Sequence, residues 1–271
     1  MPAGLPFDPA RLLVILAVVG ARPMGLVLLH PVFGRFGLGS GILRGAVIVA
    51  MSAPVLPVAA ARLAEDPGLA APAMVARLIP CELAIGLVMG LLTGVPFWAA
   101  LAAGDFIDNQ RGASMASLFD PQSSTEASVT GTLLFLTSIL VLAAEGVLFP
   151  AIFGPLMQSY ALFPVMGGLA LPDPAQGALA LRLLDQILRA GLVLALPVLV
   201  PLLLAEIVIA IATKYTQQVN AMFLAMSVKQ GIAALLMLVY AAILARHAMG
   251  QVGQGAFGVE ALAPFLRGAT R

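Results

Sequence analysis

The chain alternates long apolar stretches with shorter polar ones, and this pattern predicts helices that cross a membrane. The apolar stretches carry few charged residues and lie near residues 12–33, 42–61, 79–104, 127–165, 189–212 and 230–248. About 20 helical residues, each rising about 1.5 Å, cross the ~30 Å apolar layer of a bilayer, so each stretch is long enough to be a span. The expected fold is therefore all-α, with about six hydrophobic helical segments.

Two of these stretches are expected to be interrupted. The first contains Pro23 and Pro31, and proline removes a backbone donor and clashes with the preceding helical turn. The fourth, 127–165, is too long for one simple span and contains Glu145 and Pro150. It is either one long helix or a helix followed by a broken or re-entrant piece.

The composition supports a membrane protein and narrows the possible chemistry. Hydrophobic residues make up 61% of the chain and charged residues 10%, with a mean hydropathy of +1.04, whereas soluble domains carry about 25% charged residues. A net charge of +1 gives no basic field for nucleic acid. One cysteine, Cys81, and two histidines, His30 and His247, offer no disulfide and no zinc spacing. No metal, cofactor or nucleic-acid partner is expected.

A polar segment, Gly104–Thr125, lies between the third and fourth apolar stretches. Its charges and amides are Asp105, Asp108, Asn109, Gln110, Arg111, Asp120 and Gln122. This density favours a functional segment, either an exposed loop or the polar lining of a cavity. Asp108 and Arg111 are one helical turn apart, so an ion pair between them is expected.

Glycines recur along the third apolar stretch at Gly86, Gly90 and Gly94. Small residues at four-residue spacing let another backbone approach one face of a helix closely. The spacing therefore predicts a helix–helix contact face.

A long helix is expected from about Asp173, which can cap it, with Pro174 at its first position. If the helix continues to Thr213, it covers about 40 residues, or ~60 Å, while a bilayer core needs ~30 Å. Either Pro197 and Pro201 bend this helix or the protein does not lie wholly in lipid.

Charged residues within the apolar stretches leave two other classes of protein open. These residues are Arg44, Glu82, Glu145 and Glu206. An ion-coupled transporter would place such groups along one pathway, but one per stretch favours pairing between helices or subunits. An aspartyl intramembrane protease would need Gly-x-Gly-Asp, and the chain has Ala102-Ala103-Gly104-Asp105. Nucleophilic and metal chemistry have no positive support.

Two motifs of the chain resemble those of one family. In the segment between the last two stretches, the first reads Gln218-x-Asn220-x-x-Phe223-Leu224-x-Met226-x-x-Lys229, similar to PQ-x-N-x-FFLSMP-x-K. The second reads Gly104-Asp105-Phe106-Ile107, then Gln110-x-Gly112-x-Ser114 and Asp120-Pro121, similar to AGE-x-I, Q-x-G-x-S and DP. Both are typical of the SctT/FliR group of type III export-apparatus proteins, with a closer likeness to the SctT branch. The resemblance covers essentially the whole chain.

The resemblance implies a non-enzymatic subunit present in one copy in an export gate with SctR-like and SctS-like partners. Residues 1–170 would correspond to an SctR-like helical part, and 171–271 to an SctS-like hairpin. The subunit would lie in the bacterial inner membrane, in an assembly raised toward the periplasm. Further contacts would be with SctU-like and SctV-like components, lipid and translocating unfolded proteins.

The resemblance and the glycine spacing together predict two sets of functional residues. The first set forms a plug, Arg111–Pro121, that closes the gate, together with the base of this plug. Its members are Asp108, Asn109, Gln110, Arg111, Gly112, Met115, Phe119, Asp120 and Pro121. Subunit interfaces would involve Gly86, Gly90, Gly94, Gln218, Asn220, Phe223, Met226 and Lys229. An ion-coupled secondary transporter remains the alternative, because neither set excludes it.

Overall fold

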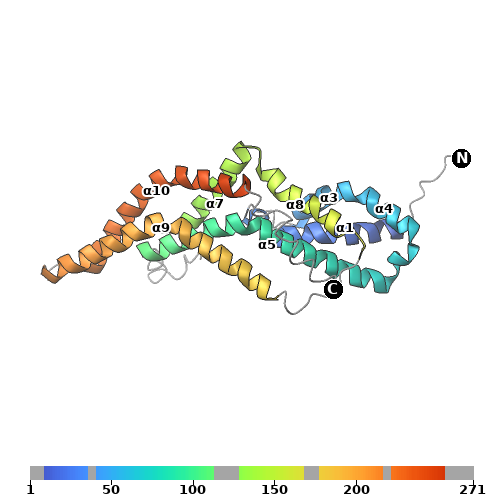
Figure 1. The fold of residues 1–271 in the computed structure, drawn as a ribbon, viewed down its shortest axis with the longest axis horizontal. Coiled ribbons are helices and arrows are strands. Elements are labelled where there is room, and N and C mark those ends of the chain that lie inside the picture. Colours follow the sequence, from blue (N-terminus) through green and yellow to red (C-terminus); the bar gives the residue numbers. More distant parts are fainter. Residues whose placement is uncertain (1–8, 36–40, 113–127, 168–176, 216–220, 254–271) are drawn as a thin grey trace. The chain divides into compact units, whose positions relative to one another are not determined.

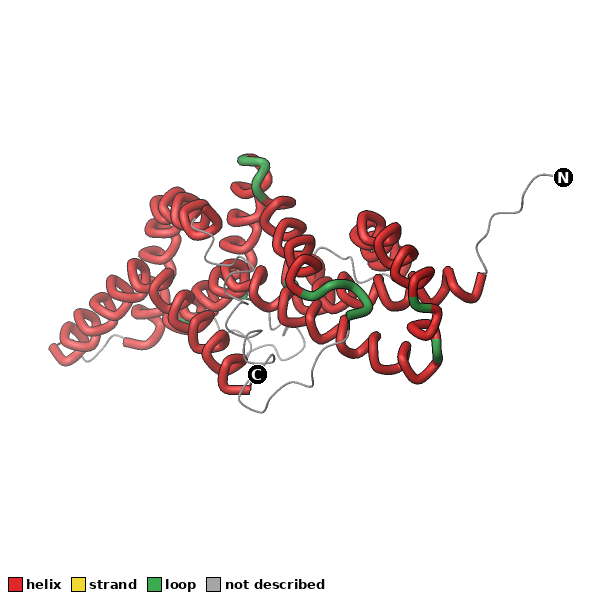
Figure 2. Tube along the Cα trace, turned by 45° about the vertical axis from the view of Figure 1, so that its right-hand side comes forward, coloured by secondary structure: helices red, strands yellow, loops and turns green. Residues whose placement is uncertain are grey.

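The computed structural model describes residues 9–35, 41–112, 128–167, 177–215 and 221–253, which are almost entirely helical (Figures 1 and 2). No strand occurs in these ranges, so the expected all-α fold is confirmed. The elements in chain order are α1 (Pro9–Leu29), α2 (Pro31–Arg35), α3 (Gly41–Ser52), η1 (Ala53–Val55), α4 (Leu56–Glu65), η2 (Pro67–Ala70), α5 (Pro72–Arg111), α7 (Val129–Ala144), α8 (Leu148–Leu162), α9 (Gly177–Tyr215) and α10 (Ala221–Gly253).

Both expected interruptions are present. α1 ends at Leu29 and α2 begins at Pro31, so the first apolar stretch is divided. The fourth stretch is broken into α7 and α8, and Gly146 between them has a φ of +69°, a conformation that glycine adopts without strain. The second stretch contains a break that the pattern did not predict, the 3-10 turn Ala53–Val55 between α3 and α4.

Among the described residues, four helical stretches are long and apolar enough to cross a membrane: Arg11–Leu29, Gly41–Glu65, Pro72–Arg111 and Ile187–Tyr215. The broken pair α7 and α8 makes a fifth if it is counted as one span. The apolar part of α10, Leu224–Tyr240, is shorter than a span. The described parts of the six expected segments are thus mostly helical, but within these parts fewer than six segments meet the length of a full crossing.

Two helices are much longer than a bilayer requires. α5 has 40 residues and α9 has 39, which at 1.5 Å per residue is about 60 Å each. The predicted long helix is therefore present as α9, and it continues through Pro197 and Pro201. Its predicted cap, Asp173, lies outside the described residues.

The described residues form two compact units that alternate along the sequence. The first unit contains residues up to Gly94 and from Phe149 to Leu179; the second contains residues from Val95 to Leu148 and from Ala180 to Ala256. Helix α5 contributes to both. The division at residue 170 concerns likeness to other subunits and stays a prediction.

In the first unit, α1 lies against α3 and α4 (Figure 1). The core of this unit is formed by apolar side chains of α1, η1, α4, α5 and the turn after α8: Ile15, Val18, Val19, Val55, Ala59, Leu63, Leu78, Val165 and Met166. Burial of these side chains fixes the helices that carry the first polar network described below.

In the second unit, α5, α7, α9 and α10 share a core rich in small residues: Ala99, Ala100, Ala103, Ile107, Leu134, Leu194, Ala195, Val198, Leu202, Ala233 and Tyr240. Alanine and glycine let the helices approach closely. A Cβ atom added to Gly104 of α5 would lie 2.0 Å from the Cα atom of Gly131 in α7. The backbones of α5 and α7 are therefore in direct contact where α7 begins.

Candidate functional site

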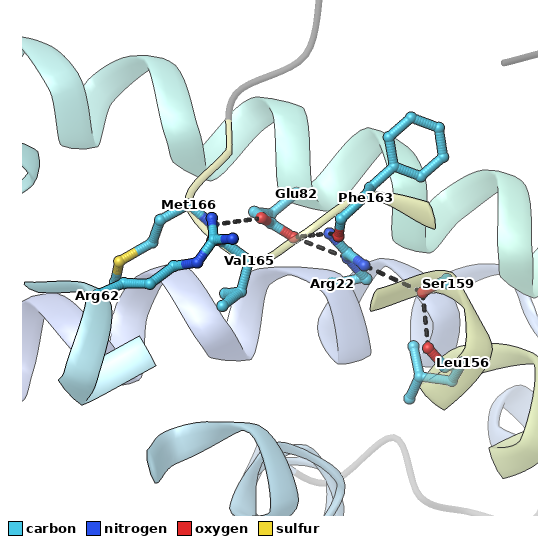
Figure 3. A network of polar contacts seen from close by, with 8 residues as sticks. All are labelled: Arg22, Arg62, Glu82, Leu156, Ser159, Phe163, Val165 and Met166. Carbon is cyan, nitrogen blue, oxygen red and sulfur yellow. Dashed lines mark hydrogen bonds and ion pairs between the residues drawn. The ribbon is translucent and has the colours of Figure 1, made fainter. Parts of the chain in front are cut away.

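The first unit contains a buried polar network centred on Arg22 of α1 (Figure 3). The Arg22 guanidinium is fully buried and lies 2.7 Å from the carboxylate of Glu82 in α5. It also donates to the hydroxyl of Ser159 at 3.0 Å and to the carbonyl of Phe163 at 3.1 Å. The ring of Tyr160 lies 4.0 Å from the guanidinium carbon. One arginine thus joins α1 to α5 and to the end of α8.

The same network holds the turn that follows α8. The other oxygen of Glu82 accepts a hydrogen bond from the backbone N–H of Met166 at 3.3 Å. Arg62 of α4 donates to the carbonyl of Val165 at 3.0 Å. Met166 has a φ of +61°, which is uncommon for a residue other than glycine and is held here by these contacts. Side chains from α1, α4 and α5 therefore hold the backbone of one turn.

The predicted glycine contact lies next to this network. A Cβ atom at Gly86 would lie 2.0 Å from the carbonyl oxygen of Arg22, and one at Gly90 would lie 2.6 Å from that of Leu26. Gly94 is buried one turn further along. The predicted helix–helix contact is present, and for Gly86 and Gly90 the helix in contact is α1 of the same chain, where another subunit was expected.

In the second unit, the segment expected to be a loop begins as helix. α5 continues through Gly104 to Arg111, so Asp108, Asn109 and Gln110 lie in its last turn. Gly112, with a φ of +82°, ends the helix, and its N–H donates to the carbonyl of Asn109 at 3.2 Å. A basic residue followed by glycine is a typical helix end, and this signal in Arg111-Gly112 marks the boundary that the polar composition obscured.

Asp108 joins the two sides of the connection between α5 and α7. Its carboxylate lies 2.8 Å from Nε of Arg111, which confirms the predicted ion pair. It also accepts hydrogen bonds from the hydroxyl of Ser128 at 2.6 Å, from the N–H of Thr130 at 3.2 Å and from the Thr130 hydroxyl. One buried carboxylate therefore fixes the residues that flank segment 113–127.

A second group of contacts links this end of α5 to α9 and α10. One oxygen of Glu206 in α9 accepts from the amide of Gln110 at 3.0 Å and from Nζ of Lys229 at 3.2 Å. Arg111 donates to the side-chain oxygen of Gln230 at 3.0 Å. Lys229 is 8% exposed. Side chains from three helices thus meet at the last turn of α5.

These contacts show which charges of the apolar stretches find partners. The predicted pairing between helices is confirmed for Glu82 and Glu206, while Glu145 lies exposed at the end of α7. Arg22, as the partner of Glu82, was not predicted, because the two residues are far apart in sequence and hydropathy carries no pairing information. Gln230 was missed for the same reason.

The motif that runs from Gln218 to Lys229 lies largely on α10. Because α9 ends at Tyr215 and α10 begins at Ala221, Phe223, Met226 and Lys229 are helical residues and do not belong to a long connection. Met226 lies beside Gly112, since a Cβ atom there would be 3.7 Å from the methionine side chain. The other predicted residues lie outside the described residues: Met115, Phe119, Asp120, Pro121, Gln218 and Asn220.

Residues 13–255 match the family described as "Bacterial export proteins, family 1". The chain is 32% identical over 228 residues to "Yop proteins translocation protein T" of Yersinia pestis, covering 84% of this chain and 85% of that protein. It is 33% identical to "Surface presentation of antigens protein SpaR" of Salmonella typhimurium, covering 82% and 83%. It is 27% identical to "Flagellar biosynthetic protein FliR" of Pectobacterium carotovorum subsp. carotovorum, covering 73% of each chain. The matched residues include parts of both compact units.

Proposed function

This chain belongs to family 1 of the bacterial export proteins, the group of SctT and FliR, and we propose that it is a gate subunit of a type III secretion apparatus. In this role it acts in protein export. It is present in one copy, and with partner subunits it forms and seals the inner-membrane channel through which unfolded proteins are secreted. The seal is a plug that begins at Arg111 and includes residues to Pro121.

The observation that carries this proposal is the position of Asp108. Its carboxylate binds Arg111 on one side of segment 113–127 and Ser128 and Thr130 on the other. A segment held together at its base can project from the helices without unwinding them. Met115 and Phe119 would exclude water from the closed channel, and the small residues of the same segment would allow close packing: Gly112, Ala113, Ser114, Ala116 and Ser117.

The surface of α9 supports assembly with partner subunits. Only 17% of its most apolar part is buried within the chain. The exposed side chains include Leu192, Leu196, Leu203, Leu204, Ile207 and Ile211. A helix of about 60 Å is longer than lipid alone can cover. SctR-like and SctS-like subunits cover the rest of this surface, and SctU-like and SctV-like components dock onto the assembled gate.

Native mass measurement tests the assembly. The tagged chain, produced with its SctR-like and SctS-like partners and purified in mild detergent, should carry several copies of each partner per single copy of itself. A transporter would instead be recovered alone or as a homo-oligomer. Recovery without the two partners, under conditions in which all three proteins are made, contradicts the gate-subunit proposal.

A deletion tests the seal. Removing Gly112–Ser117 leaves the helices and the contacts of Asp108, Gln110 and Arg111 in place, so the complex should assemble in normal amounts. The inner membrane should then admit small dyes and ions with no substrate in transit, because the channel is no longer closed. The control is wild type at equal complex abundance. A tight membrane in the deletion variant contradicts the assignment of the plug.

A further inference from the structure

Lys229 of α10 lies in an unusual environment for a lysine. Its side chain is 10% exposed, and it is on the apolar part of the helix, Leu224–Tyr240. Burying an ammonium group is unfavourable unless a counter-charge is close. The carboxylate of Glu206, 3.2 Å from Nζ, supplies that charge from α9. The position of Lys229, and of this part of α10, therefore depends on Glu206.

Glu206 also connects the pair to α5. The oxygen that accepts from Lys229 also accepts from the amide of Gln110. The neighbouring residue on α10, Gln230, accepts from Arg111. Two consecutive residues of α10 are thus linked to two consecutive residues at the end of α5, one directly and one through Glu206.

The face of α10 that makes these links also contacts the residue that ends α5. Met226 is one turn before Lys229 and Gln230 on the same face, and it lies beside Gly112. Among the described residues, the end of α5 is contacted by side chains of α9 and α10 and, through Asp108, by Ser128 and Thr130 where α7 begins. The two groups of contacts are chemically distinct. Asp108 joins Arg111 to the start of α7, whereas Glu206 and Lys229 join Gln110 to the hairpin formed by α9 and α10.

We propose that Glu206 and Lys229 form a latch that couples the α9–α10 hairpin to the gate. This inference rests on the proposed function, because it concerns the point from which the plug begins. With the latch closed, Gln110 and Arg111 are held against α10 and the plug stays seated. When the latch opens, Asp108 still joins Arg111 to Ser128 and Thr130. Gln110 and Arg111, at the base of the plug, are then free to move away from α10.

The exposure of the two partners fits a latch. Lys229 is enclosed, whereas the Glu206 side chain is 50% exposed. Water or a partner side chain can therefore reach Glu206 and compete for it without the core opening. A movement of α9 that withdraws Glu206 leaves Lys229 without its counter-charge and so displaces α10 as well.

The first experiment replaces one charge and then exchanges the two. Glu206→Gln keeps the size of the side chain but removes the charge, so we expect dye entry into non-secreting cells to rise roughly fivefold or more, the lower end of typical couplings between sites. The exchange Glu206→Lys with Lys229→Glu restores the pair, and the amide of Gln110 can still bind either group because it is both donor and acceptor. It should return dye entry close to wild type. A single variant that stays tight, or an exchange that leaks as much as the single variant, overturns the latch.

The matched control is Asp185→Asn, which removes the charge from another ion pair of α9. Asp185 and Arg189 lie 2.8 Å apart, with side chains 58% and 79% exposed, so no enclosed charge depends on this pair. Dye entry should stay at the wild-type level. All variants are compared in the complete complex at equal abundance.

A second variant decides the question if Glu206→Gln does not assemble. Gln230→Leu breaks the link to Arg111 and leaves every charge in place, and Gln230 is exposed, so assembly should be preserved. Dye entry should rise in this variant too, and a tight membrane overturns the proposal.

The Gly112–Ser117 deletion separates the two proposals. If the deletion leaks and the latch variants do not, only the latch is wrong; if the deletion is tight, the gate assignment fails and the latch with it.

Discussion

The two polar networks of this chain differ in how far solvent reaches them. In the first unit, the side chains of Arg22 and Glu82 are 0% and 4% exposed. In the second unit, the side chains of Asp108 and Arg111 are 11% and 20% exposed, and that of Glu206 is 50% exposed. Water can take the place of a broken hydrogen bond in the second network but not in the first. The first network is therefore suited to a fixed joint and the second to a part that rearranges.

The surroundings of each network agree with this division. In the first unit, charged side chains hold backbone groups of the turn Phe163–Gly167, and the glycine contact beside them brings α1 and α5 together. In the second unit, the network is made mostly between side chains at the end of α5. Charges in an apolar chain thus serve two purposes, and burial distinguishes them. Glu82 and Glu206 are both paired, so neither offers the free carboxylate that an ion-coupled transporter would need.

The largest effect is expected from breaking the buried pair. Glu82→Gln leaves Arg22 enclosed without a counter-charge, a change that typically destabilises a protein by about 3–5 kcal/mol. The amount of complex recovered and its melting temperature in detergent should both fall strongly. In the double variant Arg22→Met with Glu82→Leu, apolar groups replace both charges, and part of the loss should be regained. A double variant no better than the single one would show that charge burial is not the cause.

The next effect concerns the glycine contact of the same unit. Gly90→Ala places a Cβ atom 2.6 Å from the backbone oxygen of Leu26, so α1 and α5 must separate. Overpacking of this kind costs about 1–3 kcal/mol, which should lower the melting temperature of the complex. Gly154→Ala on α8 is the matched control, since nothing lies within 4 Å of its added atom. Equal melting temperatures for the two variants would contradict a tight contact at Gly90.

Local features of both networks can be predicted from the sequence, and long-range ones cannot. The pairing of Asp108 with Arg111 follows from a spacing of three residues on a helix, and the breaks at Pro31 and near Glu145 follow from proline, glycine and length. The partners of Glu82 and Glu206 are brought together only by the packing of the helices. Hydropathy reports which residues avoid water, but it contains no information about which side chain of another helix lies against a given residue.

The helix ends show the same limit. The polar residues around Asp108–Arg111 and within Lys214–Lys229 suggest connections, yet Asp108–Arg111 and Met226–Lys229 both lie in helices. Their side chains bind one another, so the polar residues stabilise the helix ends that they were expected to interrupt. The predicted gate and interface residues are thus brought together in part: Gln110, Arg111, Gly112, Met226 and Lys229 meet at the end of α5.

A smaller effect is expected from Asp108→Asn. The variant loses the charge that pairs with Arg111 but keeps one oxygen that accepts from Ser128 or Thr130. Because this site is reached by water, the loss should be near the lower end of the ~1–3 kcal/mol typical of a weakened buried hydrogen bond. Complex abundance should be unchanged while dye entry increases. Thr137→Val on α7, whose hydroxyl donates to Leu133 within the same helix, should leave dye entry unaltered.

The smallest effect is expected from Asp185→Asn, which separates distance from burial as the source of stability. Asp185 lies 2.8 Å from Arg189, the same distance that separates Asp108 from Arg111. Both side chains of this pair are exposed, so the pair contributes only about 0.3–0.5 kcal/mol to stability, and salt screens the interaction further. Melting temperature and secretion should match wild type within error. A clear loss of complex would mean that another subunit covers this face of α9, because only removal from water gives such a pair a larger energy. Such a loss would then indicate that the first turns of α9 lie at a subunit contact.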